Sequence, residues 1–284
     1  MRKTRLKFQT ECSVQDAFVF QKDNLPTNPK RLLLVHGAGI GGELTWSFVT
    51  QYLNAWDVIL VPDIAGMGKS RFHSNEQPKL TDYHTQLDEL IDTVAWPTYD
   101  FDVAGYSFGG MLVESWLRGT AFNNLCFLLE PAMLISDTKE DLLNKAAGYA
   151  EVAQMILANP NNSDAYVLFL NSVSPKRKDD IKNEQLIIKR LQANPIGFAQ
   201  TLLAITEKLE SDHKYYVNWR SPWQGASFVG ELSWSSMHRR HQQLAQQSEC
   251  WCYEVVAGAD HSLVFTRPRT IAKVMNEIKN EVQN

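Results

Sequence analysis

The chain has 284 residues, of which 44% are hydrophobic and 21% are charged, and its formal net charge is −4. This length accommodates one large α/β domain or two small ones, and the composition excludes a disordered, collagen-like or disulfide-scaffold protein. The slight acidic excess supplies no positive field. We therefore expect neither a nucleic acid nor an anionic membrane as a partner.

The cysteines and the apolar runs of the sequence indicate the cellular compartment of the protein. Four cysteines are too few for a disulfide framework in a chain this long. Cys12, Cys126 and Cys252 lie among apolar residues, which predicts reduced thiols of the core type. Neither a signal peptide nor an apolar run of the roughly 18 residues that a membrane helix needs is recognisable. We expect a cytoplasmic protein.

Short β-rich runs alternate with helical patterns along most of the chain. The predicted strands occupy residues 31–35, 58–61, 101–104, 125–129, 226–229 and 253–256. Apolar residues spaced three and four apart predict helices over 80–96, 111–117 and 267–282. The first strand is almost continuously apolar, as in a parallel strand buried on both faces. The alternation predicts an α/β fold, a mostly parallel sheet flanked by helices.

This alternation stops between Pro131 and Arg220, where the sequence shows helical periodicity without a buried strand. We therefore predict two parts: an α/β core formed by residues 1–130 and 221–284, and a helical segment, residues 131–220, inserted after the strand that follows the third predicted strand and its helix.

A serine stands at the junction between a predicted strand and a predicted helix. Residues 105–109 read G-Y-S-F-G and match the pattern G-x-S-x-G in the context that gives it meaning. A sharp strand-to-helix turn would expose the hydroxyl of Ser107 above the sheet, and glycines on either side let neighbouring backbone approach. The backbone amide of Phe108 would then face a developing oxyanion.

A serine hydroxyl is a poor nucleophile without a base, and the best candidate for the base is His261. It follows the last predicted strand, at the edge of the sheet where parallel sheets build their sites. His238 and His241 lie on a predicted helix beside two arginines, which favours a charged, exposed face over a metal site. After the first strand, His36 braces a loop whose Ala38 would supply a second oxyanion amide.

Four motifs in order carry a family resemblance: H-G-A-G at 36–39, D-I-A-G-M-G-K-S at 63–70, G-Y-S-F-G-G at 105–110 and G-A-D-H at 258–261. On these motifs the chain resembles the α/β-hydrolase-fold superfamily, and within it capped serine hydrolases of the esterase or thioesterase kind. The resemblance implies Ser107 as nucleophile, His261 as general base and the amides of Ala38 and Phe108 as oxyanion donors. It also implies that residues 131–220 form a cap over the pocket.

The chain departs from that family at the position of the triad acid. The acid usually follows the strand before the last, in a stretch resembling G-E-x-D, but residues 230–233 read G-E-L-S. Ser233 carries no charge that could orient an imidazole. A family variation places the acid after the preceding core strand, where Glu130 stands.

We predict Glu130 as the acid, because the chain order of serine, acid and histidine is then kept. The competing interpretation of Glu130 is a carboxylate that braces the hinge of the inserted segment. Glu231 is a lesser candidate. Asp260 is too close in sequence to His261 to reach the far side of its ring easily.

Two nucleotide-binding patterns compete with this interpretation. Residues 37–42 read G-A-G-I-G-G after a strand, and Asp63 follows about 20 residues later, as in a dinucleotide-binding fingerprint. Residues 63–70 resemble a phosphate-binding loop, but an aspartate replaces its first glycine and no helix is predicted after Ser70. Neither pattern explains Ser107 and His261.

The sequence thus predicts a serine hydrolase that cleaves a small to medium carboxylic ester or thioester through an acyl-enzyme on Ser107. No metal and no organic cofactor is implied, and the expected partner is the small-molecule substrate. Two alternatives stay open. One is a non-hydrolytic, lyase-like or catalytically weak binding member of the same fold, which the serine at 233 would suit. The other is a dinucleotide-binding protein.

Overall fold

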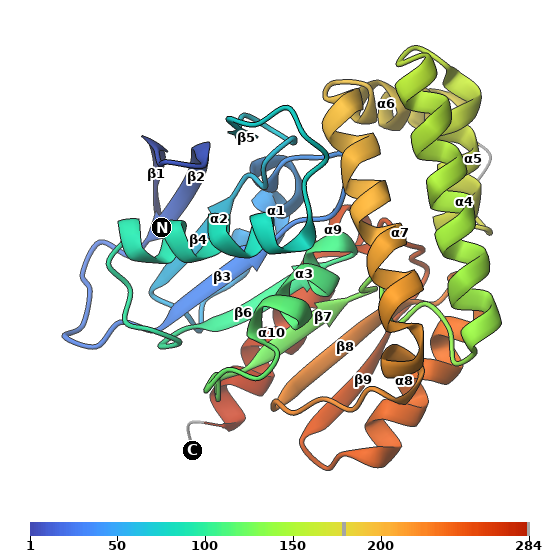
Figure 1. Ribbon diagram of the computed structural model, residues 1–284. Coiled ribbons are helices and arrows are strands. Elements are labelled where there is room, and N and C mark those ends of the chain that lie inside the picture. The colour runs from blue at the N-terminus through green and yellow to red at the C-terminus, as the bar shows by residue number, and fades with distance from the viewer. Residues whose placement is uncertain (178–179, 283–284) are drawn as a thin grey trace.

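The computed structural model describes residues 1–177 and 180–282. Within these ranges nine strands form one sheet, flanked by helices on both faces (Figure 1). The strands are β1 (Arg2–Gln9), β2 (Ser13–Gln21), β3 (Arg31–Val35), β4 (Val58–Pro62), β5 (Arg71–Phe72), β6 (Asp102–Tyr106), β7 (Cys126–Leu129), β8 (Gly225–Gly230) and β9 (Trp251–Val256). The helices are α1 (Gly42–Thr50), α2 (Leu80–Thr93), α3 (Phe108–Leu117), α4 (Lys139–Ala158), α5 (Ser163–Val173), α6 (Ile181–Leu191), α7 (Pro195–Asn218), α8 (Ser235–Gln247), α9 (Leu263–Thr266) and α10 (Pro268–Glu281).

The sheet is antiparallel at one end and parallel elsewhere. Its strand order is β1-β2-β4-β3-β6-β7-β8-β9, and β5 pairs with β2 outside this path. The pairs β1–β2 and β2–β4 are antiparallel, whereas every pair from β4 to β9 is parallel. All six predicted strands are present, and the mostly parallel sheet is confirmed.

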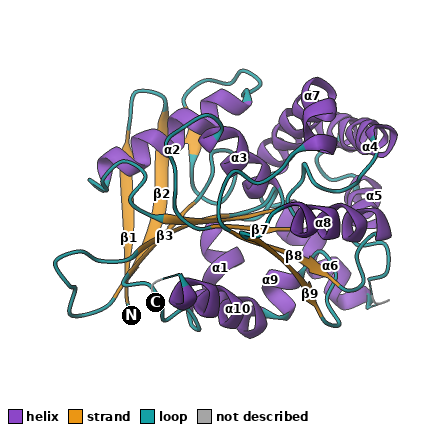
Figure 2. Ribbon diagram, turned by 90° about the horizontal axis from the view of Figure 1, so that it is seen from below, coloured by secondary structure: helices purple, strands orange, loops and turns teal. Residues whose placement is uncertain are grey.

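Alternate side chains of β3 enter two separate cores, one on each face of the sheet. Leu33 and Val35 pack with residues of α2, α3 and α8, whereas Leu32 and Leu34 pack with residues of α1, α9 and α10. Figure 2 shows the parallel part of the sheet nearly edge-on between these two helix layers. Burial on both faces is the reason the strand reads as an unbroken apolar run.

Four helices, α4 to α7, lie between β7 and β8 in the sequence, and we call them the inserted helices. They stand together beside the sheet, with α4 packed along α7 (Figure 1). Helix α7 approaches the core closely, since a Cβ on Gly197 would lie 1.7 Å from the carbonyl oxygen of Gly66. Only a glycine at 197 permits this contact with the loop that follows β4.

Several residues behave differently from what the sequence predicts. Cys126 is buried as expected, but Cys12 and Cys252 are exposed. The predicted helix α8 is present, yet His241 and Arg240 are buried, so the prediction of an exposed face is wrong for both. The reason is a tertiary contact: the Arg240 guanidinium donates to backbone carbonyls at the C-terminal end of α7. Within the described ranges, no helix has both the length and the apolar character needed to cross a membrane.

Candidate active site

Ser107 occupies a strained turn between β6 and α3. Its backbone has φ 53° and ψ −116°, in a region that L-residues rarely adopt. The turn is tight enough to require its glycines, because a Cβ on Gly105 would lie 2.5 Å from the carbonyl oxygen of Gly109. A Cβ on Gly109 would in turn lie 2.4 Å from that of Val35. The sequence motif therefore corresponds to the predicted sharp bend, and the half-buried Ser107 lines a cavity.

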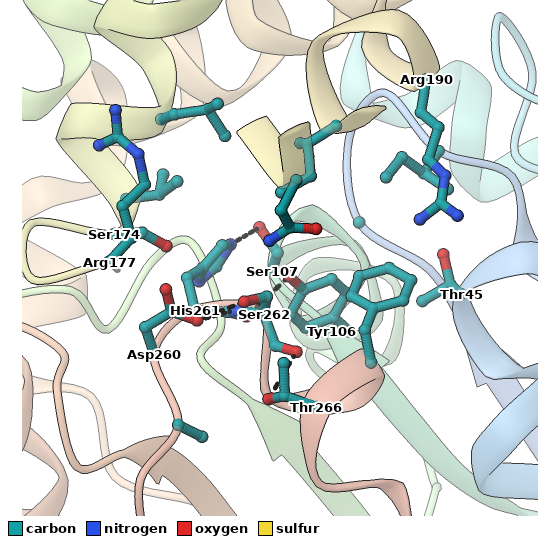
Figure 3. Close-up of a pocket in the computed structure, with 18 of the residues that line it drawn as sticks. Thr45, Tyr106, Ser107, Ser174, Arg177, Arg190, Asp260, His261, Ser262 and Thr266 are labelled. Atoms are coloured by element: carbon teal, nitrogen blue, oxygen red, sulfur yellow. Dashed lines mark hydrogen bonds between the residues drawn. The ribbon is translucent and has the colours of Figure 1, made fainter. Parts of the chain in front are cut away.

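The structure brings Ser107, His261 and Glu130 together, from the ends of β6, β9 and β7 (Figure 3 shows the first two). The Nε2 atom of His261 lies 3.1 Å from the Oγ of Ser107, and its Nδ1 lies 2.7 Å from Oε2 of Glu130. A carboxylate only accepts, so Nδ1 carries the proton and donates it to Glu130. Nε2 is then free to accept the hydrogen bond of the serine hydroxyl.

Glu130 is fully buried, and three donors surround its carboxylate. Besides the histidine, the backbone amide of Gly230 donates to Oε1 at 2.7 Å, and the Ser233 hydroxyl donates to the same oxygen at 2.5 Å. Hydrogen bonds to an ionised acceptor offset much of the cost of burying its charge. Ser233, which the family resemblance places at the usual position of the acid, thus contacts the carboxylate of Glu130.

Tyr106, the residue before Ser107, anchors the loop that carries His261. Its hydroxyl donates to the backbone carbonyl of His261 at 2.8 Å, and the two rings pack with centroids 5.2 Å apart. Burial raises the pKa of Tyr106 well above its usual value, and the nearby carboxylates of Glu130 and Asp260 raise it further. The phenol therefore stays protonated and keeps this hydrogen bond.

The loop after β3 lies across from Ser107, and its Gly37 and Ala38 line the same cavity. A Cβ on Gly37 would lie 3.0 Å from that of Ser107, so the loop passes directly over the serine. Phe108 is the first residue of α3, and its amide has no carbonyl partner within the helix. Both candidate oxyanion donors are thus on backbone next to Ser107.

His36 fixes this loop through both ring nitrogens. Its Nε2 accepts from the amide of Ile64 at 2.8 Å, so its Nδ1 carries the proton that it donates to the carbonyl of Gly37 at 2.7 Å. Burial lowers the pKa of His36, and the neutral form agrees with this pattern. The bracing role predicted for His36 matches these contacts.

The remaining candidate acids point elsewhere. Asp63 is buried and accepts from the amides of Gly42 and Lys69, so it ties two loops together instead of presenting an acceptor for a ribose. Glu231 accepts from the amide of Gly258 at 2.7 Å. Asp260 accepts from the amide of Ser262 at 2.9 Å and from its hydroxyl.

The phosphate-loop pattern also lacks its structural context, because the short strand β5 follows Ser70 where a helix is needed. Within the described part of the chain, no group of three or more histidine, cysteine or acidic side chains is placed to hold a metal ion.

A cavity of about 280 Å³ opens beside Ser107 and His261. The core contributes its floor, while helices α5 and α6 and the loop between them contribute the opposite wall. Its apolar lining includes Ile40, Phe169, Leu170, Val173, Ile187, Leu191, Leu232 and Phe265. This size and lining are typical of a small-molecule site.

Sequence reasoning missed two contributors to this site. From the sequence, Ser233 indicates the loss of an acid, although a serine at that position is also a donor that a neighbouring carboxylate can use. Tyr106 lies in the x position of G-x-S-x-G, where the motif specifies no residue type. Its hydrogen bond joins β6 to the loop after β9, and no local pattern encodes such a contact.

Comparisons with known proteins agree with this architecture. The model of the alpha/beta hydrolase family matches residues 32–274. A proposed epoxide hydrolase from Pseudomonas aeruginosa superposes with a TM-score of 0.73 at 14% identity, covering 99% of this chain and 96% of the other.

Two further solved structures show the same fold. A haloalkane dehalogenase loop variant from Bradyrhizobium elkanii gives a TM-score of 0.73 at 13% identity, and the match covers 99% of this chain and 98% of the dehalogenase. A thermophilic esterase from Thermogutta terrifontis gives a TM-score of 0.71 at 17% identity, and the match covers 99% of this chain and 100% of the esterase. No curated protein matches the chain by sequence.

Proposed function

The chain belongs to the alpha/beta hydrolase family, and on that premise we propose that it is a serine hydrolase acting on a small to medium carboxylic ester or thioester. The observation that carries the proposal is the continuous hydrogen-bond chain from Glu130 through His261 to Ser107 at the edge of a cavity. A nucleophile, a base and a group that orients the base are what acyl transfer by an alcohol requires.

The proposed reaction proceeds through a covalent acyl-enzyme. As the Oγ of Ser107 attacks the carbonyl carbon, its proton passes to Nε2 of His261, while Glu130 stabilises the imidazolium and holds its tautomer. The amides of Ala38 and Phe108 donate to the tetrahedral oxyanion, each contributing about 3 kcal/mol. His261 then gives the proton to the departing oxygen or sulfur as its bond to carbon breaks.

A water molecule completes the cycle. It gives a proton to Nε2 of His261 while its oxygen attacks the acyl carbon, and the same imidazole returns a proton to Ser107 as the acid leaves. The residues involved are those of the first step, so the site needs no further group of its own.

The chemistry of an alcohol nucleophile favours an acyl substrate over an epoxide or a haloalkane. If the Oγ of Ser107 were alkylated, the product would be an ether, and water attack at that carbon would need an alkoxide leaving group. An ester on Ser107 is instead cleaved by the reverse of its formation. Turnover therefore depends on a carbonyl carbon in the substrate.

We further propose that residues 131–220 act as a cap on a core formed by residues 1–130 and 221–284. Helices α5 and α6 contribute one wall of the cavity above Ser107. Covering the site in this way would exclude bulk water and strengthen the electrostatic interactions inside. The apolar residues of this wall would accommodate the uncharged part of the substrate.

The test is hydrolysis of a panel of esters and thioesters of graded acyl length by the wild type and by Ser107→Ala. We expect turnover by the wild type and a loss of about 10⁴-fold or more in the variant. A fluorophosphonate probe should label the wild type at Ser107 only, as mapped by peptide mass spectrometry. Equal turnover by a correctly folded Ser107→Ala protein would rule the proposal out. Absence of both turnover and labelling would favour a non-hydrolytic member of the fold.

A further inference from the structure

The cavity beside Ser107 contains several charged side chains, and most of them are paired within the protein. Arg177 forms a salt bridge with Glu184, 2.6 Å from nitrogen to oxygen, and also donates to Asn171. Arg267 donates to three backbone carbonyls, and Asp260 accepts from Ser262. Each of these side chains therefore already has hydrogen-bond partners within the protein.

Arg190 is different. It lines the same cavity from the last turn of α6 and is half-buried, yet its guanidinium forms no hydrogen bond or salt bridge with any residue that the structure describes. In Figure 3 its guanidinium is directed into the cavity, toward Thr45 and away from His261. The lining of this cavity also includes the apolar side chains of Ile40 and Ile187.

An unpaired guanidinium at an apolar wall has a strong preference for an anion. Arginine stays charged at every physiological pH, and its planar set of donors matches the two oxygens of a carboxylate. Screening by water is weaker in a partly enclosed site, so a charge-assisted hydrogen bond formed there is worth more than at the surface. Of the described cavity residues, three are arginines and two carry carboxylates, which leaves one positive charge.

A purely structural explanation for Arg190 is that a cation near a helix C-terminus interacts favourably with the helix dipole. Lys189 occupies the same last turn and is exposed, so it supplies that interaction without facing the cavity. Lys189 therefore offers a matched control that separates the two roles.

We propose that Arg190 forms an anion subsite, and that the substrate is an ester or thioester carrying a carboxylate some distance from the reacting carbonyl. The inference rests on the proposed function, because it takes Ser107 as the point where that carbonyl is held. The carboxylate binds the guanidinium near Thr45, and the chain between the two ends lies along the apolar wall. Arg190 is then a specificity-determining residue.

The experiment compares thioesters of unbranched dicarboxylic acids, each with one free carboxylate, with thioesters of monocarboxylic acids of equal chain length. The same small thiol is used throughout, and its release is followed colorimetrically. A second series carries the carboxylate on the thiol part. For each pair the ratio of kcat/KM for the charged to the neutral substrate is determined in the wild type, Arg190→Met, Arg190→Lys and Lys189→Gln.

We expect a wild-type ratio above one at a preferred chain length in one series. Arg190→Met should lower that ratio about 10- to 100-fold, Arg190→Lys should restore part of it, and Lys189→Gln should leave it unchanged. A wild-type ratio at or below one at every length in both series would overturn the subsite, as would an equal loss in Lys189→Gln. Neither result would affect the proposed function, which is tested separately by the turnover of the neutral esters and thioesters in the wild type and in Ser107→Ala.

Discussion

Replacement of Glu130 by glutamine tests the chain of hydrogen bonds that runs from Glu130 through His261 to Ser107. The carboxylate accepts from three donors, namely the His261 ring, the Gly230 amide and the Ser233 hydroxyl. An amide side chain has one acceptor oxygen and one NH₂ group. If its oxygen keeps the two bonds on the Gly230 side, its NH₂ faces Nδ1 of the histidine.

The imidazole must then move its proton to Nε2, and in that tautomer it can no longer accept the proton of Ser107. The charge that stabilises the imidazolium is lost at the same time. By analogy with the serine-protease acid, we expect kcat/KM to fall by about 10⁴-fold, equivalent to about 5 kcal/mol of transition-state stabilisation. In the opposite orientation the NH₂ group of the glutamine faces the Gly230 amide and the Ser233 hydroxyl, which are both donors to the native carboxylate. Each donor left without an acceptor then costs about 1–3 kcal/mol of stability.

The assay is initial-rate hydrolysis of the best ester or thioester from the panel, at saturating and subsaturating concentrations, with circular dichroism and a thermal melt as the test of folding. Glu130→Asp keeps the charge on a side chain one methylene shorter, and it should retain more activity than the glutamine variant. Wild-type kcat/KM in a folded Glu130→Gln protein would refute the assignment and leave Glu130 the role of a structural brace.

Other substitutions probe the surroundings of the site and the stability of the fold. Ser233→Ala removes one donor from Glu130 and should lower kcat/KM about tenfold, and an unchanged rate in the same assay would show that this hydroxyl is dispensable. Gly109→Ala forces a Cβ to within 2.4 Å of a β3 carbonyl oxygen and should cost about 3 kcal/mol or more in urea unfolding. A Cβ on Gly148 would meet no atom within 4 Å beyond its chain neighbours and the backbone of its own helix, so Gly148→Ala should instead stabilise α4 by about 0.5–1 kcal/mol. Destabilisation by both substitutions would contradict this steric explanation. Burial, with a smaller contribution from neighbouring cations, lowers the pKa of His241 from 6.5 to about 3, so the unfolded chain takes up a proton that the folded chain does not. This proton uptake does not affect the free energy of unfolding above about pH 6.5, but it lowers that free energy as the pH falls, by about 2 kcal/mol at pH 5. The His241→Leu substitution should remove this contribution to the pH dependence of stability.

Most of the parallel part of the sheet could be predicted because β3, β4, β6, β7 and β8 are buried along nearly their whole length and read as mostly apolar runs, whereas the edge strand β9 is only partly buried. The N-terminal hairpin could not be predicted. Strand β1 is largely exposed and rich in charged residues, and it forms because its backbone pairs with β2 along its whole length. Helix α1 was also missed, since it begins at Gly42, inside a glycine-rich stretch typical of a loop.

The positions of Ser107 and His261 could be predicted because a parallel sheet collects the residues that follow its strands along one edge. Glu130 follows the same rule at the end of β7. Arg190 has no such marker. Its place in the cavity depends on how α6 packs over the sheet domain. Leu191 of α6 lies so close to Gly39 that a Cβ on Gly39 would be 2.4 Å from a methyl carbon of Leu191. Packing of this kind is set by three-dimensional fit between distant segments and leaves no local pattern.

The location of the Glu130 carboxylate follows from the pairing of β7 with β8. Leu129 lies opposite Phe228 in this parallel pair, and the amide of Glu130 donates to the carbonyl of Phe228 at 3.0 Å. The backbone of Glu130 then turns with φ 43°, and its side chain crosses to the end of β8, where Ser233 and Gly230 donate to it. The carboxylate therefore occupies the space next to the residue that usually supplies it. A glutamate at the end of the neighbouring strand β7 thus brings its carboxylate to within 2.7 Å of Nδ1 of His261.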